Sequence, residues 1–502
     1  MKALKIIENI ILAIAICFVT TGAFVFLYIN QEIINNDILL IIPFSFFILL
    51  MLCVFILGLI KPKFVLKNQV IITFATALIT VIIGFLLILF YAITDYFQPL
   101  SLFNIPIIGM AGFLIFYGIA ELISFIIKSN SLSGMVIGIA VLCIFLATSI
   151  WSTSQNYGVF SSEAESVILF SDGDNGYSTF RIPVIVNIDK DVINSNLSKS
   201  LEHDMLVAIV EGRRNSSLDN GAIDIIIKTS IDNGITWSAM SVVLRWEDYD
   251  SGEGRVADPT AVFNKLTGKL CLLYRAGSKL SGYSTECYYI EGSIESDFSI
   301  NWDYDNIINV NDKLGASPSP GPSKGLQLLD GTLAFPARSS GASYVIYTND
   351  NGNTWTRGAD SGTGGECDIA MIDDNEMILI SREGNMSSFP RNNELRFAFS
   401  DDRGLTWYQE TKDSTLRTPV CMSSVASYNG VIYCAYANSY LTRANLSYAT
   451  SDNKGLTWDI HSLYSGATGY AVGTFNSEGQ YFVIAEIGKV EYNEEIRLFR
   501  IS

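Results

Sequence analysis

Four short stretches of the chain repeat one pattern, and their spacing constrains the fold more than any other feature of the sequence. Each contains Asp or Asn, then Gly, then Thr-Trp, and each follows a run typical of a β-strand. They read SIDNGITW at 230–237, TNDNGNTW at 348–355, SDDRGLTW at 400–407 and SDNKGLTW at 451–458. An Asx side chain accepts hydrogen bonds from nearby amides, and Gly permits a positive φ. The pattern therefore predicts four similar turns, each with a Trp packed beneath it.

The spacing of these turns predicts a β-propeller. The last three copies start at 348, 400 and 451, which is a period of 52 and 51 residues. The 118 residues between the first two starts accommodate two such units, with a degenerate copy, SDFSINW, at 296–302. A period near 50 built of short strands is typical of propellers. Dividing residues 165–502 by this period predicts six blades.

The first 151 residues differ in composition from the rest and predict a membrane region. Each of their five apolar stretches reaches about the 20 residues that a membrane-spanning helix needs. The stretches lie near 9–29, 38–60, 70–93, 105–127 and 134–151. Four helices are the alternative, because the fifth stretch is short and contains Gly. The first stretch is favoured as an uncleaved anchor over a signal peptide, because NQEIINND rather than a small-residue cleavage site follows it.

Lysine positions predict the orientation of this region. All six lysines of the first 151 residues lie near the N-terminus, at 61–67 or at 128. The positive-inside rule then places the N-terminus in the cytoplasm and the chain after about residue 152 outside the cell. The predicted fold class is thus an all-β six-bladed propeller preceded by about five transmembrane helices. The predicted domains are a membrane region at 1–151, a linker at 152–164 and the propeller at 165–502, in a multi-pass plasma-membrane protein.

Charge and residue usage exclude several classes of partner and chemistry. Residues 152–502 contain 27 basic and 45 acidic residues, a net charge of −18, so nucleic acid and anionic lipid are poor partners. The whole chain has only two histidines, which leaves almost nothing for Ser-His-Asp catalysis or a His-based zinc site. The stretch SDGDNG at 171–176 lacks the closing glutamate of a calcium loop and predicts a turn. We expect no metal and no cofactor.

The cysteines predict buried thiols rather than disulfides. Five of them lie after residue 152, an odd number that cannot pair completely, and most occupy apolar, strand-like contexts. They are Cys271, Cys287, Cys367, Cys421 and Cys434.

One arginine stands in an unexpectedly apolar context. Arg181 lies in STFRIP at 178–183, directly before the apolar run VIV at 184–186, which is typical of a buried strand. An arginine is almost never fully buried without a partner, because an unpaired interior charge is costly. The sequence therefore predicts an anion that compensates Arg181.

With FRIP before them, the repeated turns resemble the Asp boxes of the sialidase (neuraminidase) superfamily, in particular bacterial-type exo-sialidases. The resemblance covers nearly all of 165–502 and implies a six-bladed propeller. It also implies an exo-sialidase that removes terminal sialic acid from sialylated glycoproteins, glycolipids or oligosaccharides. Asp boxes also occur as structural turns in unrelated propellers, so the function depends on the residues between them.

The resemblance implies that three arginines clamp the carboxylate of sialic acid. Arg181 of FRIP matches the first, Arg382 in MILISREGN the second and Arg443 in LTRANLSYATS the third. A planar guanidinium suits this task because it bonds both carboxylate oxygens and stays charged at any relevant pH. Glu486 in FVIAEIG resembles the glutamate that orients the first arginine.

The stretch EGRRNSSLDNGAIDI at 211–225 resembles the one that carries the acid/base aspartate of the family. By this match Asp219 would protonate the departing glycosidic oxygen and later activate water. Arg213 would contact the substituents of the sugar ring, with Arg214 as the competing choice. Asp258 in RVADPTAV resembles the aspartate that reads the ring 4-hydroxyl and amide region.

Glu366 in TGGECDIAMI and Tyr470 in SGATGYAVGTF match the catalytic glutamate and tyrosine of the family. The anomeric carbon of sialic acid bears a carboxylate, so an anionic nucleophile would meet a like charge. A neutral phenol deprotonated by a neighbouring glutamate avoids this repulsion.

Three alternatives remain open from the sequence. An intramolecular trans-sialidase that releases an anhydro sugar would use the same residues. A non-catalytic sialic-acid-binding propeller would be expected to lose Asp219, Glu366 or Tyr470, and all three are present. A transporter or sensor is less favoured because the predicted helices are poor in polar groups apart from Glu121, so anchoring is the simpler role.

Overall fold

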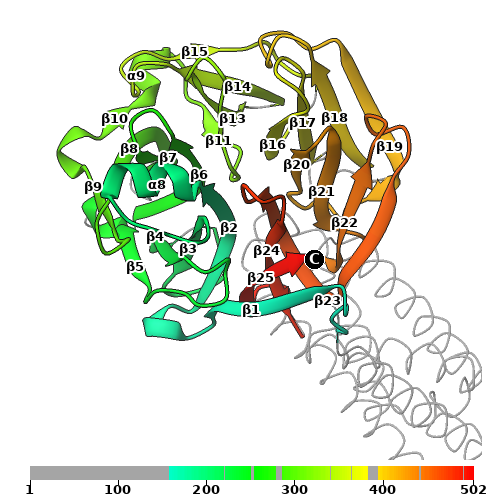
Figure 1. The fold of residues 1–502 in the computed structure, drawn as a ribbon, viewed down its shortest axis with the longest axis horizontal. Coiled ribbons are helices and arrows are strands. Elements are labelled where there is room, and N and C mark those ends of the chain that lie inside the picture. The colour runs from blue at the N-terminus through cyan, green and yellow to red at the C-terminus, as the bar shows by residue number, and fades with distance from the viewer. Residues whose placement is uncertain are drawn as a thin grey trace, which may run out of the picture. The chain divides into compact units, whose positions relative to one another are not determined.

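Antiparallel strands joined by short turns make up most of the described chain (Figure 1). The structure is a computed structural model that describes residues 158–501 except 220, 250–253, 279–284, 340, 363, 383–393, 440–442 and 490. Gly158–Ser502 form one compact unit. The described helices are short: α8 (Lys190–Leu197), α9 (Val310–Leu314) and the 3-10 turns η1 (Asp174–Gly176), η2 (Trp246–Asp248) and η3 (Tyr304–Asn306).

The described strands hydrogen-bond into four sheets of seven, nine, five and four strands. Taken in chain order, these sheets comprise six groups of strands around a ring (Figure 1). The first group is β2 (Thr179–Ile188), β3 (Met205–Arg213), β4 (Ile223–Ser230) and β5 (Ser241–Leu244). The second is β6 (Gly254–Asn264), β7 (Lys269–Ser278) and β8 (Thr285–Ile294), with β9 (Ile300–Trp302) and β10 (Ile308–Asn309) beside β8. The third is β11 (Ser319–Pro320), β12 (Leu326–Gln327), β13 (Leu333–Ser339), β14 (Ala342–Thr348) and β15 (Thr356–Arg357).

The remaining groups complete the ring. The fourth is β16 (Cys367–Met371), β17 (Met377–Arg382), β18 (Glu394–Ser400) and β19 (Gln409–Arg417). The fifth is β20 (Ser424–Tyr428), β21 (Val431–Ala437), β22 (Ala444–Ser451) and the first half of β23 (Asp459–Phe475). The sixth is the second half of β23, β24 (Tyr481–Gly488), β25 (Glu495–Ile501) and β1 (Ala164–Ser171). Because β1 pairs antiparallel with β25, the two ends of the propeller are joined within one blade.

The repeated stretches form the predicted turns. In the third copy, Asp402 accepts hydrogen bonds from the Thr406 amide at 2.8 Å and from its hydroxyl at 2.5 Å. Gly404 of the same turn has a φ of +84°, which a side chain would strain. In the fourth copy, Asn453 accepts from the Thr457 amide at 3.0 Å and donates to its hydroxyl at 2.7 Å. An amide thus replaces the carboxylate there without loss of either contact.

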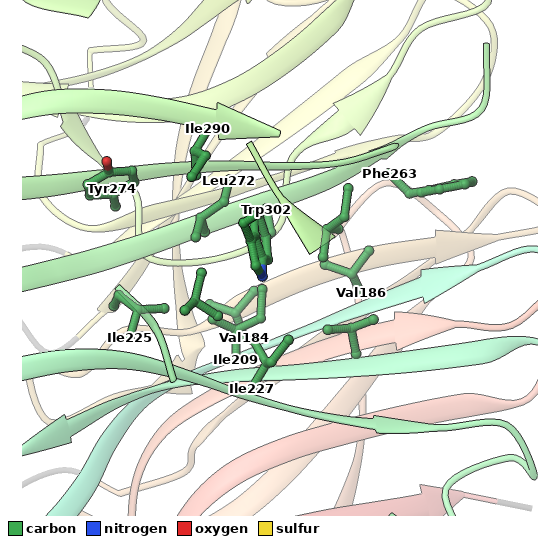
Figure 2. Close-up of a cluster of buried hydrophobic side chains, with 14 of the residues drawn as sticks. Val184, Val186, Ile209, Ile225, Ile227, Phe263, Leu272, Tyr274, Ile290 and Trp302 are labelled. Atoms are coloured by element: carbon green, nitrogen blue, oxygen red, sulfur yellow. The ribbon is translucent and has the colours of Figure 1, made fainter. Parts of the chain in front are cut away.

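One apolar core lies between the first two blades (Figure 2). Strands β2, β3, β4, β6, β7 and β8 all contribute to it, and Trp302 of the degenerate repeat packs into it. The buried side chains include Val184, Val186, Ile209, Ile225, Ile227, Phe263, Leu272, Tyr274 and Ile290. Successive side chains of a strand point to opposite faces of the sheet. The side chains on the other face of β2 and β3 therefore contribute to a second core.

The five cysteines of the propeller are buried free thiols, as the sequence predicts. They are Cys271, Cys287, Cys367, Cys421 and Cys434.

The predicted membrane region requires a correction. In the part of the chain that the structure describes, no helix is long and apolar enough to cross a membrane. The described α-helices have eight and five residues, far fewer than the roughly 20 that a bilayer requires. This finding contradicts the predicted fold class with its five transmembrane helices and the predicted multi-pass localisation. The five stretches themselves, with Glu121, lie outside the described residues. The β-propeller remains as the fold, and the predicted domain boundaries stay predictions.

We expect Leu272→Ala to destabilise the propeller by about 2–5 kcal/mol, because it removes a fully buried side chain and leaves a cavity between two blades. Urea unfolding of the full-length chain, followed by tryptophan fluorescence, measures the change. Leu456→Ala is the control: this side chain is 79% exposed, so the change is less than about 0.5 kcal/mol. Equal midpoints for both variants would contradict the packing described here.

Candidate active site

Three of the predicted site residues lie where a strand shifts register against its neighbour. Such a bulge changes the direction in which side chains point. Ile182 and Asp258 have a φ of +55°, a conformation that non-glycine residues rarely adopt. The shifts lie between Arg181 and Val184 in β2, between Ala257 and Thr260 in β6, and between Thr468 and Ala471 in β23. Arg181, Asp258 and Tyr470 thus all occupy irregular positions in otherwise regular strands.

Glu486 of β24 connects two of these irregular positions. Its side chain is 0% exposed, and Oε1 accepts hydrogen bonds from Arg181 Nε at 3.1 Å and from the Ile182 amide at 3.0 Å. Oε2 accepts from the Tyr470 amide at 3.1 Å. A Cβ at Gly469 would overlap Oε2, so only glycine fits beside this carboxylate. Glu486 therefore contacts both Arg181 and the backbone at Tyr470, and the orienting role that the resemblance implies stays a prediction.

Tyr470 contacts all three arginines of the predicted clamp. Arg382 Nη1 donates to the Tyr470 hydroxyl at 3.0 Å. The guanidinium carbons of Arg181 and Arg443 lie 5.5 and 5.4 Å from the centroid of the Tyr470 ring. The same two carbons lie 5.2 and 4.7 Å from the ring of Tyr492, so both arginines make cation–π contacts with two tyrosines. The three arginines, from different blades, thus converge on one tyrosine.

Tyr470 and Glu366 form a buried acid–base pair. The Tyr470 hydroxyl donates a short hydrogen bond to Glu366 Oε2, which is also 3.0 Å from Arg382 Nη1. Burial raises the pKa of Tyr470 well above its usual value, against the opposing charge of Arg382. Burial also favours the neutral form of Glu366, but the charges of Arg382 and Arg338 outweigh it and hold the pKa of Glu366 below its usual value. A protonated phenol therefore faces an ionised carboxylate.

Asp219 is bound to two arginines. Its Oδ1 lies 2.8 Å from Arg213 Nη2 and 3.4 Å from Arg181 Nη1, while the side chain remains 62% exposed. Desolvation disfavours the charged form, but the charges of Arg213 and Arg181 outweigh it and hold the pKa of Asp219 well below its usual value. Arg213 is itself buried and paired with Glu211 at 2.7 Å. Asp219 is thus an accessible carboxylate that is ionised in the free protein.

Arg214, the competing choice for Arg213, has other partners. Its Nη2 donates to Asp224 Oδ2 at 2.8 Å and to the Tyr177 hydroxyl at 2.9 Å. The structure therefore brings Arg213, and not Arg214, to Asp219. Burial and a hydrogen bond to Asp224 raise the pKa of Tyr177 above its usual range.

Sequence reasoning missed Arg338, Tyr492 and Glu211. Asp258 Oδ2 lies 3.3 Å from Arg338 Nη2, which is also 3.6 Å from Glu366 Oε1. The available signal for Arg338 was its place after the apolar strand LAFPA, just as Arg382 follows MILIS. Glu211 lies two residues before Arg213 and hence on the same face of β3. Tyr492 carries no such signal, since it lies outside any strand.

Comparisons with known proteins identify the family. The sequence profile of the BNR repeat-like domain matches residues 204–490. The chain belongs to this family. A sialidase of Bacteroides fragilis (strain YCH46) is 23% identical to this BNR repeat-like protein over 321 residues, which is 57% of this chain and 55% of that protein. A sialidase of Paraclostridium sordellii is 26% identical over 305 residues, 54% of this chain and 69% of that protein. The chain thus spans about half the length of the Bacteroides relative.

Solved structures share the fold of the BNR repeat-like chain. The NanB sialidase of Streptococcus pneumoniae superposes with a TM-score of 0.54 at 14% identity, covering 68% of this chain and 71% of that one. Trypanosoma rangeli sialidase with 2,3-difluorosialic acid gives 0.54 at 18% identity, covering 68% and 60%. A leech intramolecular trans-sialidase gives 0.52 at 16% identity, covering 67% and 70%. Together with the family and the curated relatives, this likeness supports the resemblance to the sialidase superfamily.

We expect Glu486→Ala to destabilise the propeller by about 3–5 kcal/mol, because it leaves the buried Arg181 without its closest counter-charge. Thermal and urea unfolding of the full-length chain measure the change. Glu165→Ala serves as the control, since it removes an ion pair to Arg500 at an exposed carboxylate and changes stability little. A loss no larger than that of the control would contradict the role of Glu486.

Proposed function

We propose that the chain is an exo-sialidase that hydrolyses terminal sialic acid from glycoconjugates, with Tyr470 as the nucleophile of a retaining mechanism. One observation carries the proposal: a buried tyrosine is hydrogen-bonded to a buried glutamate and contacts three arginines. Sialic acid demands this combination because its anomeric carbon bears a carboxylate. The curated relatives of the chain are named sialidases, which supports the same assignment.

The arginines supply the binding site for the substrate carboxylate. Arg181 and Arg382 already have carboxylate partners in Glu486 and Glu366. Within the described residues, Arg443 forms no ion pair and contacts the rings of Tyr470 and Tyr492. A substrate carboxylate would supply the missing negative charge, and guanidinium groups bind both of its oxygens in fixed geometry.

The first chemical step forms a bond between the Tyr470 oxygen and the anomeric carbon. Glu366 accepts the phenolic proton, because the hydroxyl already donates its hydrogen bond to Glu366 Oε2. The bond from the anomeric carbon to the glycosidic oxygen breaks, and Asp219 protonates the departing oxygen. In the second step Asp219 removes a proton from water, the water oxygen attacks the anomeric carbon, and Tyr470 leaves and recovers its proton from Glu366. Two displacements retain the anomeric configuration.

Asp219 must become protonated before it acts as an acid. In the free protein the charges of Arg213 and Arg181 keep it ionised. A substrate carboxylate at Arg181 neutralises part of that charge, and a sugar over Asp219 excludes water from it. Both changes favour the protonated form and raise the pKa of Asp219. Substrate binding thus prepares the acid that the reaction requires.

We expect the full-length chain to hydrolyse a fluorogenic sialoside, and both Asp219→Ala and Tyr470→Phe to lower kcat by about 100-fold or more, since each removes a group that transfers protons or bonds the substrate. Tyr408→Phe is the matched control for the tyrosine. It removes a hydrogen bond between Tyr408 and Glu376 of 3.0 Å that lies outside the site, and kcat stays unchanged.

Two results would contradict the proposal. If the chain binds sialic acid but hydrolyses none of several linkages, it is a binding module. If the product, identified by NMR, is an anhydro sugar rather than free sialic acid, the chain is an intramolecular trans-sialidase that uses the same residues.

A further inference from the structure

Arg338, at the end of β13, bridges two carboxylates that the proposed mechanism uses separately. Its Nη2 lies 3.3 Å from Asp258 Oδ2 and 3.6 Å from Glu366 Oε1. The side chain is 24% exposed, so most of it is shielded from water. Arg338 is not among the three arginines assigned to the substrate carboxylate. No step of the proposed mechanism involves Arg338.

Glu366 depends on an arginine that the substrate also requires. In the free protein Arg382 Nη1 lies 3.0 Å from Glu366 Oε2 and donates to the Tyr470 hydroxyl at 3.0 Å. When a substrate carboxylate binds Arg382, this positive charge is shared between two anions. A buried carboxylate that loses its cation tends to take up a proton. A protonated Glu366 cannot accept the proton of Tyr470.

The two cations approach Glu366 from different oxygens. Arg382 and the Tyr470 hydroxyl contact Oε2, whereas Arg338 faces Oε1. In the described part of the chain, the ionisable groups that interact with Glu366 include Arg382, Arg338, Tyr470, Arg443, Cys367 and Cys421. Arg338 is the cation among them that has contacts to Glu366 and no place in the clamp.

On the basis of the proposed function, we propose that Arg338 is a positioning residue that keeps Glu366 ionised and directed at Tyr470 while the substrate carboxylate occupies Arg382. Its own position does not depend on substrate. Asp258 holds the guanidinium from the neighbouring blade, and the Asp258 amide donates to Glu211 Oε1 at 2.9 Å. Arg338 Nε donates to the Pro320 carbonyl at 3.5 Å. Arg275 Nη1 lies 3.8 Å from the same Asp258 oxygen, so two arginines share this carboxylate.

The test compares Arg338→Met with Arg338→Lys in the full-length chain, measuring kcat and KM for a fluorogenic sialoside across pH. Loss of the cation raises the pKa of Glu366, and a general base is active only above its pKa. The acid limb of the kcat profile therefore moves to higher pH by about one unit in Arg338→Met, while KM changes little. Arg338→Lys restores most of the parent profile. Arg357→Met, which removes an arginine paired with Asp360 on the same blade, leaves the profile unchanged.

A binding measurement separates this inference from the proposed function. Calorimetry of sialic acid binding in buffers of different ionisation enthalpy counts the protons taken up. At the pH of the variant's acid limb, we expect Arg338→Met to take up more protons on binding than the parent. Asp219 gains a proton in both chains, whereas Glu366 gains one only in the variant, where it loses its last close cation. If the parent chain binds sialic acid but hydrolyses no sialoside, only the proposed function is contradicted. The difference in proton uptake between the parent and Arg338→Met then still tests the role of Arg338. A raised KM with an unmoved acid limb, or no difference between Arg338→Met and Arg357→Met, would overturn the inference.

Discussion

The buried carboxylate of Glu486 holds together the part of the propeller on which the site depends. It has no exposed surface and accepts hydrogen bonds from Arg181, from the Ile182 amide and from the Tyr470 amide. These partners lie at register shifts in β2 and β23, strands of the first and last blades. A charge in such a place is stable only when it is fully paired. One side chain therefore contacts both the first arginine of the proposed clamp and the backbone of the proposed nucleophile.

Around Glu486, the arginines of the candidate site form ion pairs with the carboxylates of the protein. Arg181 pairs with both Glu486 and Asp219, and Arg382 pairs with Glu366 beside Tyr470. These arginines already pair with carboxylates of the protein. A substrate carboxylate that binds them would therefore compete for the same positive charges. Under the proposed function, binding of the substrate carboxylate to Arg181 allows Asp219 to gain a proton. Its binding to Arg382 leaves Arg338 as the cation that keeps Glu366 ionised. The acid and the base would thus be set by the binding of the same substrate group.

Particular residues show how far the sequence predicts this structure. The spacing of Asp350, Asp402 and Asn453 predicted the blades, because a repeated turn recurs once in each structural unit. The candidate site depended on the resemblance, since Arg181, Glu366 and Tyr470 are far apart in the chain and only the closed ring brings them together. The bulges and the contacts of Arg338 depend on which strand ends lie next to one another in the folded ring. A local sequence pattern does not predict such neighbours. The membrane region was predicted from the lengths of apolar stretches alone, and the described chain, which has no helix of that length, contradicts the resulting fold class.

The most direct test of the central claim is to trap the covalent intermediate on the full-length chain with 2,3-difluorosialic acid. Its fluoride at the anomeric carbon leaves in the first displacement, and the fluorine that remains at C3 slows the second. Proteolysis and mass spectrometry then locate the modified residue. The account predicts one sugar per chain, attached to Tyr470, and no adduct in Tyr470→Phe. An adduct on Glu366 or Asp219, or an unmodified Tyr470 in a chain that hydrolyses sialosides, would contradict it.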